Sequence, residues 1–446
     1  MAVETAVRTG GRAPARWWML LGPAFVAAIA YVDPGNVAAN ITAGSRYGYL
    51  LVWVLVAANA IAMFIQYQSA KLGIVTGRSL PELLGSRLGT GTRRAFWVQA
   101  ELVAAATDIA EVIGGAIALN LLFGVPLPIG GVIIGMVAIG ILAVQTRRGQ
   151  RPFETVIVGL LAVISLGFLA GLFVSPVDWG AAAGGLVPHF DGAPTVLLAA
   201  GMLGATVMPH AIYLHSALSR DRHGRARDDG SLGESEEFGE SVGVGESGPF
   251  VGSPERSGEH GVRRLLHATR IDVVVALALA GAVNIAMLLL AAASLGGATG
   301  TDTIEGAHAA LTNALGPVIG AAFALGLLAS GLASTSVGSY AGATIMAGLM
   351  NIRVPLLLRR VVTLVPAVVL LALGVEPTWA LVLSQVLLSL GIPFAMIPLL
   401  RLTASREVMG DRADGFWMRA LGVTVATLVV VLNVTLVVLT IVGWVG

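Results

Sequence analysis

The feature that most constrains the fold of this chain is a series of apolar runs, each long enough to cross a membrane. A transmembrane helix needs roughly 20 mostly apolar residues, and the sequence contains eleven such runs. They cover residues 17–42, 48–75, 96–123, 126–146, 154–175, 194–219, 271–295, 315–349, 354–374, 377–402 and 416–445. Only 12% of the 446 residues are charged, against about 25% in soluble proteins. We therefore predict an all-α polytopic membrane protein.

The basic residues indicate how the spans are threaded. If the N-terminus is cytoplasmic, almost every arginine and the single lysine, Lys71, fall in cytoplasmic segments, and only Arg46 falls outside. Cytoplasmic loops carry an excess of Lys and Arg. We therefore expect the cytoplasmic (inner) membrane as location, with a cytoplasmic N-terminus and an extracellular or periplasmic C-terminus. The absence of cysteine excludes disulfides and thiolate metal sites.

The first apolar run is interrupted by Asp33-Pro34-Gly35-Asn36. A carboxylate at the membrane centre costs roughly 2.5–3.5 kcal/mol even on lenient scales, and proline and glycine cost a helix about 3 and 1 kcal/mol more. This combination is too unfavourable for a simple kink. It predicts a broken helix whose freed carbonyls, together with Asp33 and Asn36, attract a cation.

A second break is predicted in the sixth run, at Met208-Pro209-His210. Unwinding there would expose the carbonyl of Ala205. Five spans separate the breaks, so the two broken helices run in opposite directions through the membrane. Interruptions at matching positions of two inverted halves indicate a binding site at the membrane midplane.

Met208 narrows the choice of cation. Its thioether is a soft donor that suits Mn²⁺, Fe²⁺ or Cd²⁺ but not Na⁺, Mg²⁺ or Ca²⁺. A methionine in a membrane helix usually serves packing, but its place directly before a Pro-His break favours a ligand. In the tenth span, Gln385 is either a packing amide or a further member of the ion's shell.

Titratable residues point to a proton route. Asp108 and Glu111 are three residues apart and share one helical face, and Arg359 and Arg360 are candidate partners. The acids either form a structural ion-pair cluster or pass protons along a water path. His210, one turn from the predicted site, titrates near neutral pH and is a natural relay member.

His215 lies nearer the cytoplasmic end of its span, where it either lines a vestibule or serves packing. The loop at 221–260 is rich in Gly, Ser and Glu and is predicted to be disordered. The predicted organisation is a tail at 1–16, a first five-helix repeat at 17–175, a second, inverted repeat at 194–402 that contains this loop, and an eleventh helix at 416–445.

At these residues the chain closely resembles the Nramp family of proton-coupled divalent-metal transporters, in particular its bacterial manganese-transporting branch. The matching stretches are YVDPGNVAANITAGSRYGY, QYQSAKLGIVTGRSLPELL, ATDIAEVIGGAIALNLLFG, ATVMPHAIYLHSAL and SQVLLSLGIPFAMIPLL. The similarity covers essentially all eleven spans but not the 221–260 loop. DPGN and MPH together are specific to the family. Ala211 departs from it, since asparagine often follows the histidine there.

The resemblance implies the leucine-transporter fold, with two inverted five-helix repeats, one extra helix, and helices 1 and 6 broken. It also implies metal ligation by Asp33, Asn36, the Ala205 carbonyl, Met208 and, in some states, Gln385. The implied proton pathway is Asp33, His210, Asp108, Glu111, Arg359 and Arg360, and the implied permeation pathway includes Gln66 along with His215.

We therefore expect a secondary active transporter that imports Mn²⁺, Fe²⁺, Cd²⁺ or Co²⁺ with protons. We expect it to work as a monomer in the lipid bilayer, without a resident cofactor or nucleic-acid partner. A sodium-coupled amino-acid symporter of the same fold is an alternative, but Asp33 would repel the substrate carboxylate. An intramembrane metalloenzyme is disfavoured because His210 and His215 do not share a helical face and His-Glu-x-x-His is missing. A non-transporting metal sensor is the third alternative, and uptake assays would separate it from a carrier.

Overall fold

A computed structural model describes residues 22–228, 254–296, 300–301, 303–352 and 354–445 of the chain. The predicted tail at 1–16 lies outside the described residues, as does the middle of the predicted 221–260 loop. Both ends of that loop range are helical: one helix continues to Asp228 and the next begins at Pro254. The helices on either side of the loop therefore extend beyond the apolar runs that define the spans.

The described residues form helices and contain no β-strand. In chain order the elements are α1 (Pro23–Ile29), η2 (Ala30–Val32), α2 (Pro34–Tyr47), α3 (Val52–Thr76), α4 (Leu80–Arg87), α5 (Thr90–Phe123), α6 (Leu127–Arg148), α7 (Gln150–Val174), α8 (Trp179–Gly184), α9 (Gly192–Thr206), α10 (Pro209–Asp228), α11 (Pro254–Ser294), α12 (Ile304–Leu315), α13 (Pro317–Met350), α14 (Leu356–Ala372), α15 (Pro377–Ala404), α16 (Arg406–Met409), η4 (Gly410–Arg412) and α17 (Phe416–Val445).

Every predicted span, as far as the structure describes it, coincides with helical structure. Nine helical stretches in the described part of the chain are long and apolar enough to cross a membrane, with α9 and α10 counted as one. The other two spans are the broken helix α1–η2–α2 and α14, which has 17 residues. The chain is thus a multi-pass membrane protein. The two spans that are not among the nine long apolar stretches are either interrupted or short.

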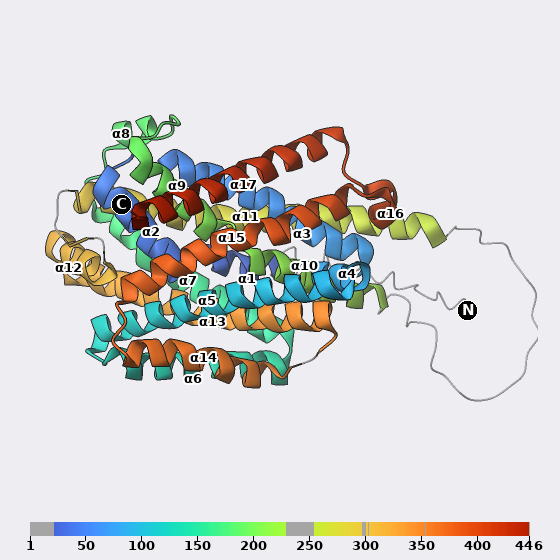
Figure 1. The fold of residues 1–446 in the computed structure, drawn as a ribbon, viewed down its shortest axis with the longest axis horizontal. Helices are drawn as coiled ribbons and strands as arrows, with labels where there is room; N and C mark the ends of the chain where they lie inside the picture. The colour runs from blue at the N-terminus through green and yellow to red at the C-terminus, as the bar shows by residue number, and fades with distance from the viewer. Residues whose placement is uncertain (1–21, 229–253, 297–299, 302, 353, 446) are drawn as a thin grey trace, which may run out of the picture.

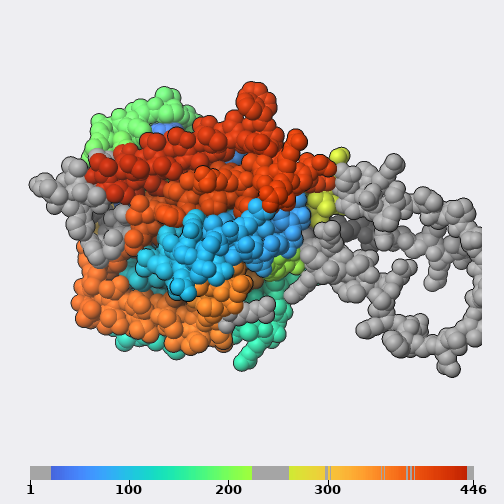
Figure 2. Space-filling view, turned by 45° about the vertical axis from the view of Figure 1, so that its right-hand side comes forward, coloured from blue at the N-terminus to red at the C-terminus, as the bar shows by residue number. Residues whose placement is uncertain are grey.

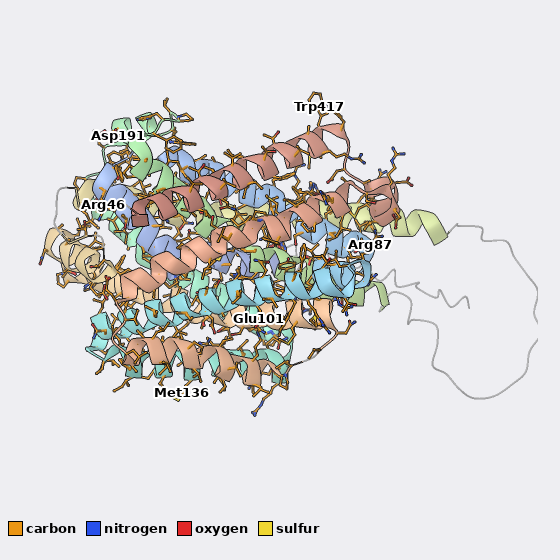
Figure 3. The ribbon with its side chains drawn as sticks, viewed as in Figure 1. Arg46, Arg87, Glu101, Met136, Asp191 and Trp417 are labelled. Carbon is orange, nitrogen blue, oxygen red and sulfur yellow. The ribbon has the colours of Figure 1, made fainter. Side chains whose placement is uncertain are left out.

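The long helices lie side by side, and the short elements lie at the two ends of the bundle (Figure 1). The short helices α4 and α16 lie at one end, and α8 and α12 lie at the other. Arg87 is at the α4 end, whereas Arg46 and Asp191 are at the opposite end (Figure 3). Arg46, the one basic residue expected outside, is therefore separated from Arg87 by the length of the bundle.

Small residues allow the helices at the centre of the bundle to approach closely. A Cβ atom added to Gly331 of α13 would lie 2.9 Å from the Cα atom of Gly115 of α5. No larger side chain fits at such a crossing, which is how membrane helices commonly pack. On the face shown in Figure 2, α15 and α17 form one continuous surface above α5, and the helices α15 and α17 are in contact.

Candidate metal site and its titratable neighbours

The first helix break lies at Asp33, where predicted. Helix η2 ends at Val32, Asp33 is extended (φ −75°, ψ 167°), and α2 begins at Pro34. Proline has no N–H to continue the helix. The Asp33 carboxylate caps the new helix instead: its Oδ1 atom accepts hydrogen bonds from the backbone N–H of Asn36 at 2.8 Å and from the Asn36 side-chain amide at 2.6 Å.

Two carbonyls freed by this break are satisfied by other helices. The Asn284 amide of α11 donates to the Tyr31 carbonyl at 2.7 Å, and the Ser330 hydroxyl of α13 donates to the Val32 carbonyl. Asn284 also accepts a hydrogen bond from Asn40 of α2 at 2.9 Å. The unwound segment is therefore held in place, because buried carbonyls inside a membrane must find donors.

We predict that Asn284→Leu destabilises the folded protein by about 1–3 kcal/mol, because the Tyr31 carbonyl and the Asn40 amide would both lose their partner inside the bundle. Chemical unfolding in lipid–detergent micelles measures this change. Thr424→Leu on α17 is the matched control, since that exposed hydroxyl donates to the Ala420 carbonyl of its own helix. Equal loss of stability in both variants would contradict the prediction.

The second break lies between α9 and α10. Helix α9 ends at Thr206, and α10 begins at Pro209. In a continuous helix the Ala205 carbonyl would accept from residue 209, but proline has no N–H to donate. That carbonyl instead accepts from the Asn36 side-chain amide at 2.9 Å. Asn36 therefore joins the two breaks, which lie 169 residues apart in sequence. Met208 sits within the second break and is fully buried.

Gln385 reaches the first break from α15. A Cβ atom added to Gly35 would collide with the Gln385 amide nitrogen and would lie 3.2 Å from Oδ2 of Asp33. Only glycine lets the amide approach this closely. Asp33 Oδ2 and the side-chain oxygen of Gln385 are buried and make no hydrogen bond within the described part of the chain. These two oxygens are available as ligands, whereas the amide nitrogen of Gln385 can only donate hydrogen bonds.

Four of the five candidate ligands thus gather from the two broken helices and α15 into one buried region, and the fifth, Met208, follows Ala205 closely in sequence. Asp33, Asn36 and the Ala205 carbonyl are joined by hydrogen bonds, Gln385 lies against Gly35, and Met208 is three residues from Ala205. None of the five is more than 9% exposed. Oxygen donors with a thioether suit a divalent transition-metal ion. The described residues contain no group of three or more His, Cys, Asp or Glu that could hold a metal. Among the five candidate ligands, Asp33 is the one carboxylate.

Two arginines of α14 bind acids of α5. Arg360 is completely buried and pairs with Asp108, which also accepts a hydrogen bond from Thr335 of α13. Arg359 pairs at 2.6 Å with Glu101 rather than with Glu111. Glu101 is not singled out by the sequence, although it lies seven residues before Asp108 and hence on the same helical face.

Glu111 makes no ion pair among the residues that the structure describes, and it is completely buried. A Cβ atom added to Gly338 of α13 would lie 3.2 Å from its carboxylate, so this glycine provides room for the acid. His210 is also buried, and neither of its ring nitrogens has a hydrogen-bond partner within the described ranges. These two residues are therefore titratable groups without strong partners in this geometry.

Gln66 and His215 form a buried chain with the first break. The Gln66 amide donates to the Tyr31 hydroxyl at 2.6 Å, and its oxygen lies 2.8 Å from Nδ1 of His215. Tyr31 belongs to η2, two residues before Asp33. His215 is fully buried and hydrogen-bonded. The place of Tyr31 in this chain is not visible in the sequence, because nothing local distinguishes it from a packing residue.

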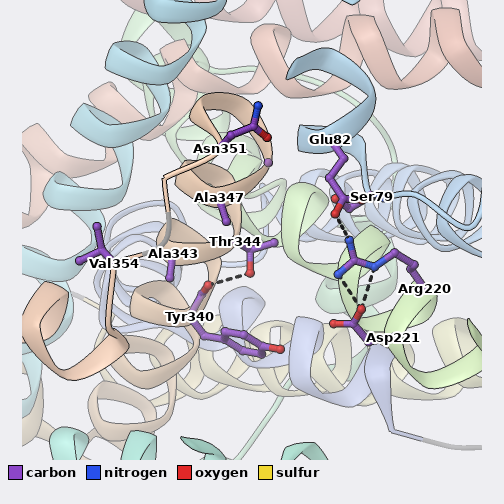
Figure 4. Close-up of a pocket in the computed structure, with 11 residues that line it drawn as sticks. Ser79, Glu82, Arg220, Asp221, Tyr340, Ala343, Thr344, Ala347, Asn351 and Val354 are labelled. Carbon is purple, nitrogen blue, oxygen red and sulfur yellow. Dashed lines mark hydrogen bonds and ion pairs between the residues drawn. The ribbon is translucent and has the colours of Figure 1, made fainter. Parts of the chain in front are cut away.

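A separate cavity of about 440 Å³ opens at the α4 end of the bundle, between α4, α10 and α13 (Figure 4). Arg220 lies on its wall and pairs with both Glu82 and Asp221. Partial burial alone would raise the pKa of Glu82, but hydrogen bonds from the Ser79 backbone and from Arg220 outweigh it and lower that pKa below its ordinary value. None of the predicted ligands lines this cavity.

Comparison with protein families gives a match over nearly the whole chain. The model of the family Nramp, described as natural resistance-associated macrophage protein-like, matches residues 24–439. The chain is 55% identical over 426 residues to the divalent metal cation transporter MntH of Mycobacterium tuberculosis (strain ATCC 25618 / H37Rv), covering 96% of this chain and 92% of the relative. It is 42% identical over 420 residues to MntH of Bacillus subtilis (strain 168), covering 94% and 91%.

Solved structures agree with this match. The manganese transporter of Eremococcus coleocola superposes with a TM-score of 0.80 at 30% identity, covering 95% of this chain and 88% of that one. Mhp1, a nucleobase-cation-symport-1 family transporter, superposes with a TM-score of 0.54 at 16% identity, covering 94% and 89%, and shows likeness of fold alone. The expected leucine-transporter fold, with two inverted five-helix repeats and one further helix, is confirmed.

Proposed function

Since the chain belongs to the Nramp family of divalent metal cation transporters, we propose that it imports Mn²⁺ and Fe²⁺, and also Cd²⁺ and Co²⁺, together with protons. The observation that carries the proposal is the hydrogen bond from Asn36 to the Ala205 carbonyl. It brings the oxygen donors of two broken helices to one buried point. A midplane site between two broken helices is typical of secondary transporters.

Asp33 would supply the charge for the ion. One of its carboxylate oxygens is engaged by Asn36, and the other is available. Binding a divalent ion disfavours the protonated acid, so metal entry would release a proton from Asp33. Gln385 would complete the oxygen shell from α15, and Met208 would add the soft donor that separates Mn²⁺ from Ca²⁺.

The proton would leave along the buried titratable groups. His210 lies in the first turn of α10, and Glu111, Asp108 and Arg360 follow on α5 and α14. We propose Glu101 as an additional member, because it pairs with Arg359 and is 27% exposed on its side chain. Partial exposure would let it exchange protons with water. The route would thus end at an acid that the sequence did not suggest.

Transport requires that the buried site open to each side in turn. All five proposed ligands are buried, so this geometry corresponds to a closed step. We propose that α1–α2 and α9–α10 rock with α3, α7 and α11, and that the cavity beside Arg220 is part of the inner path. The excess of basic residues supports a cytoplasmic position for the α4 end, and we propose a monomer in the cytoplasmic membrane as the working unit.

An amino-acid symporter of the same fold is less well supported. Such transporters aim helix N-termini at a substrate carboxylate. Here the N-terminus of α2 already holds the Asp33 carboxylate through Asn36, which would repel a second anion. The thioether of Met208 would also have no metal ion to bind.

The test is Mn²⁺ uptake into proteoliposomes, with and without an inward proton gradient and in excess Ca²⁺. We expect gradient-stimulated uptake by the wild type that persists in Ca²⁺. Met208→Ala should lose roughly tenfold in Mn²⁺-over-Ca²⁺ preference, equivalent to about 1.4 kcal/mol. Met136→Ala is the control, since Met136 is 57% exposed on the outer surface of α6 (Figure 3). Absence of Mn²⁺ flux from folded wild-type protein would overturn the carrier proposal.

A further inference from the structure

Helix α15 contains two prolines, and each frees a carbonyl one turn earlier. Pro393 cannot donate to the Ser389 carbonyl, and Pro398 cannot donate to the Phe394 carbonyl. Both carbonyls are satisfied from other helices. The Asn433 amide of α17 donates to the Ser389 carbonyl at 2.6 Å, and the Tyr213 hydroxyl of α10 donates to the Phe394 carbonyl at 3.3 Å. The course of α15 therefore depends on its neighbours.

Asn433 is bound to Ser389 by both ends of its amide. Besides donating to the Ser389 carbonyl, it accepts a hydrogen bond from the Ser389 hydroxyl. Asn433 is 5% exposed, and Ser389 is fully buried. A polar side chain on a helix that faces lipid elsewhere is unfavourable unless its hydrogen bonds are satisfied. This pair replaces the intrahelical bond that Pro393 removes.

The repaired segment of α15 lies against the second helix break. A Cβ atom added to Gly204 would lie 2.8 Å from Cβ of Ser389, and one added to Gly391 would lie 3.0 Å from Pro209. The segment thus contacts the residues on both sides of Met208. It also begins one turn after Gln385, whose amide lies against Gly35.

We propose that Asn433 is a positioning residue for the ion site. By bridging the proline-interrupted turn of α15, it sets both the place of Gln385 and the packing of the Met208 break. The eleventh helix, which lies outside the two inverted repeats, would then contribute to ion binding without contacting the ion. This inference rests on the proposed metal site, but its first test does not depend on transport.

That first test is a double-mutant cycle between Asn433→Leu and Pro393→Ala, followed by thermal unfolding in detergent. Leucine has a similar volume but cannot bond to Ser389, so we expect a fall of several degrees in the unfolding temperature. Alanine at 393 supplies the N–H that the Ser389 carbonyl lacks. In that background Asn433→Leu should cost clearly less. Equal losses in both backgrounds would overturn the bridging role.

The second test separates positioning from stability through the kinetics of Mn²⁺ uptake. Asn433→Leu should raise the KM about five- to tenfold, which is the factor in affinity that corresponds to the free energy of one hydrogen bond. The maximal rate should stay within about twofold of the wild-type rate. In the double variant the KM should fall back toward the wild-type value as the unfolding temperature rises, because the N–H supplied by Pro393→Ala takes over the bond to the Ser389 carbonyl through which Asn433 places Gln385. If Asn433→Leu lowers the unfolding temperature but leaves the KM unchanged, Asn433 is structural only and the proposal fails.

Thr435→Leu is the matched control, since Thr435 lies on the same helix and its hydroxyl donates to the Val431 carbonyl of that helix at 2.9 Å. It should change neither measurement. If wild-type protein takes up no Mn²⁺, the proposed function fails, and the unfolding cycle still decides whether Asn433 bridges α15.

Discussion

Asp33→Asn should abolish Mn²⁺ uptake while leaving the fold intact. The asparagine oxygen can still accept the two hydrogen bonds from Asn36, so the cap of α2 survives. What is lost is the only carboxylate among the proposed ligands, and an NH₂ group would replace the free oxygen. A charge pair at about 4 Å in a partly screened site is worth roughly 4 kcal/mol, which corresponds to about a thousandfold in affinity.

Isotope uptake into proteoliposomes and calorimetric titration of Mn²⁺ measure this effect independently. Asp191→Asn serves as the control, because Asp191 is exposed at the end of the bundle away from α4 (Figure 3). It should behave as wild type. Mn²⁺ affinity in Asp33→Asn within a few fold of wild type would mean that Asp33 is not a ligand.

Asp108→Asn should produce the largest loss of stability. Arg360 is completely buried, and within the described part of the chain its ion-pair partner is Asp108. Removing one partner of a buried pair leaves a charge without compensation and costs about 3–5 kcal/mol. Unfolding of purified protein in lipid–detergent micelles gives the free energy of unfolding directly.

The double variant Asp108→Asn with Arg360→Met supplies the internal check. Once both charges are gone, much of the lost stability should return, because replacing a whole buried pair is often nearly neutral. Glu101→Gln is the external comparison, since the Glu101 side chain is 27% exposed and water can solvate Arg359. Similar losses for Glu101→Gln and Asp108→Asn would show that burial is not the cause.

These expectations differ in how far the sequence supported them. The spacing of the acids in the third span marks them as candidates, and the place of Arg359 and Arg360 on the ninth span marks them as possible partners. The pairing was decided by the packing of α14 on α5, which set Arg359 on Glu101 and Arg360 on Asp108. Spacing along one helix cannot say which of two adjacent arginines faces which acid on another.

The same holds for the ion site. The two breaks can be predicted from local chemistry. Proline removes a backbone N–H, and a carboxylate in an uninterrupted apolar helix is energetically costly and usually functional. The donors that hold the broken segments were not visible. Asn284, Ser330 and Asn433 read as ordinary polar residues in apolar runs until their partners are known.

The sequence by itself determined the eleven spans, their two interruptions and the residue types available to a metal ion. A membrane imposes those features locally, through the length of each apolar run and the cost of each polar group. Only the tertiary structure decided which groups meet. Asn36 reaches Ala205, Gln385 reaches Gly35 and Asn433 reaches Ser389 across helices far apart in sequence. Such contacts depend on helix packing and on small residues at crossings, which no single segment encodes.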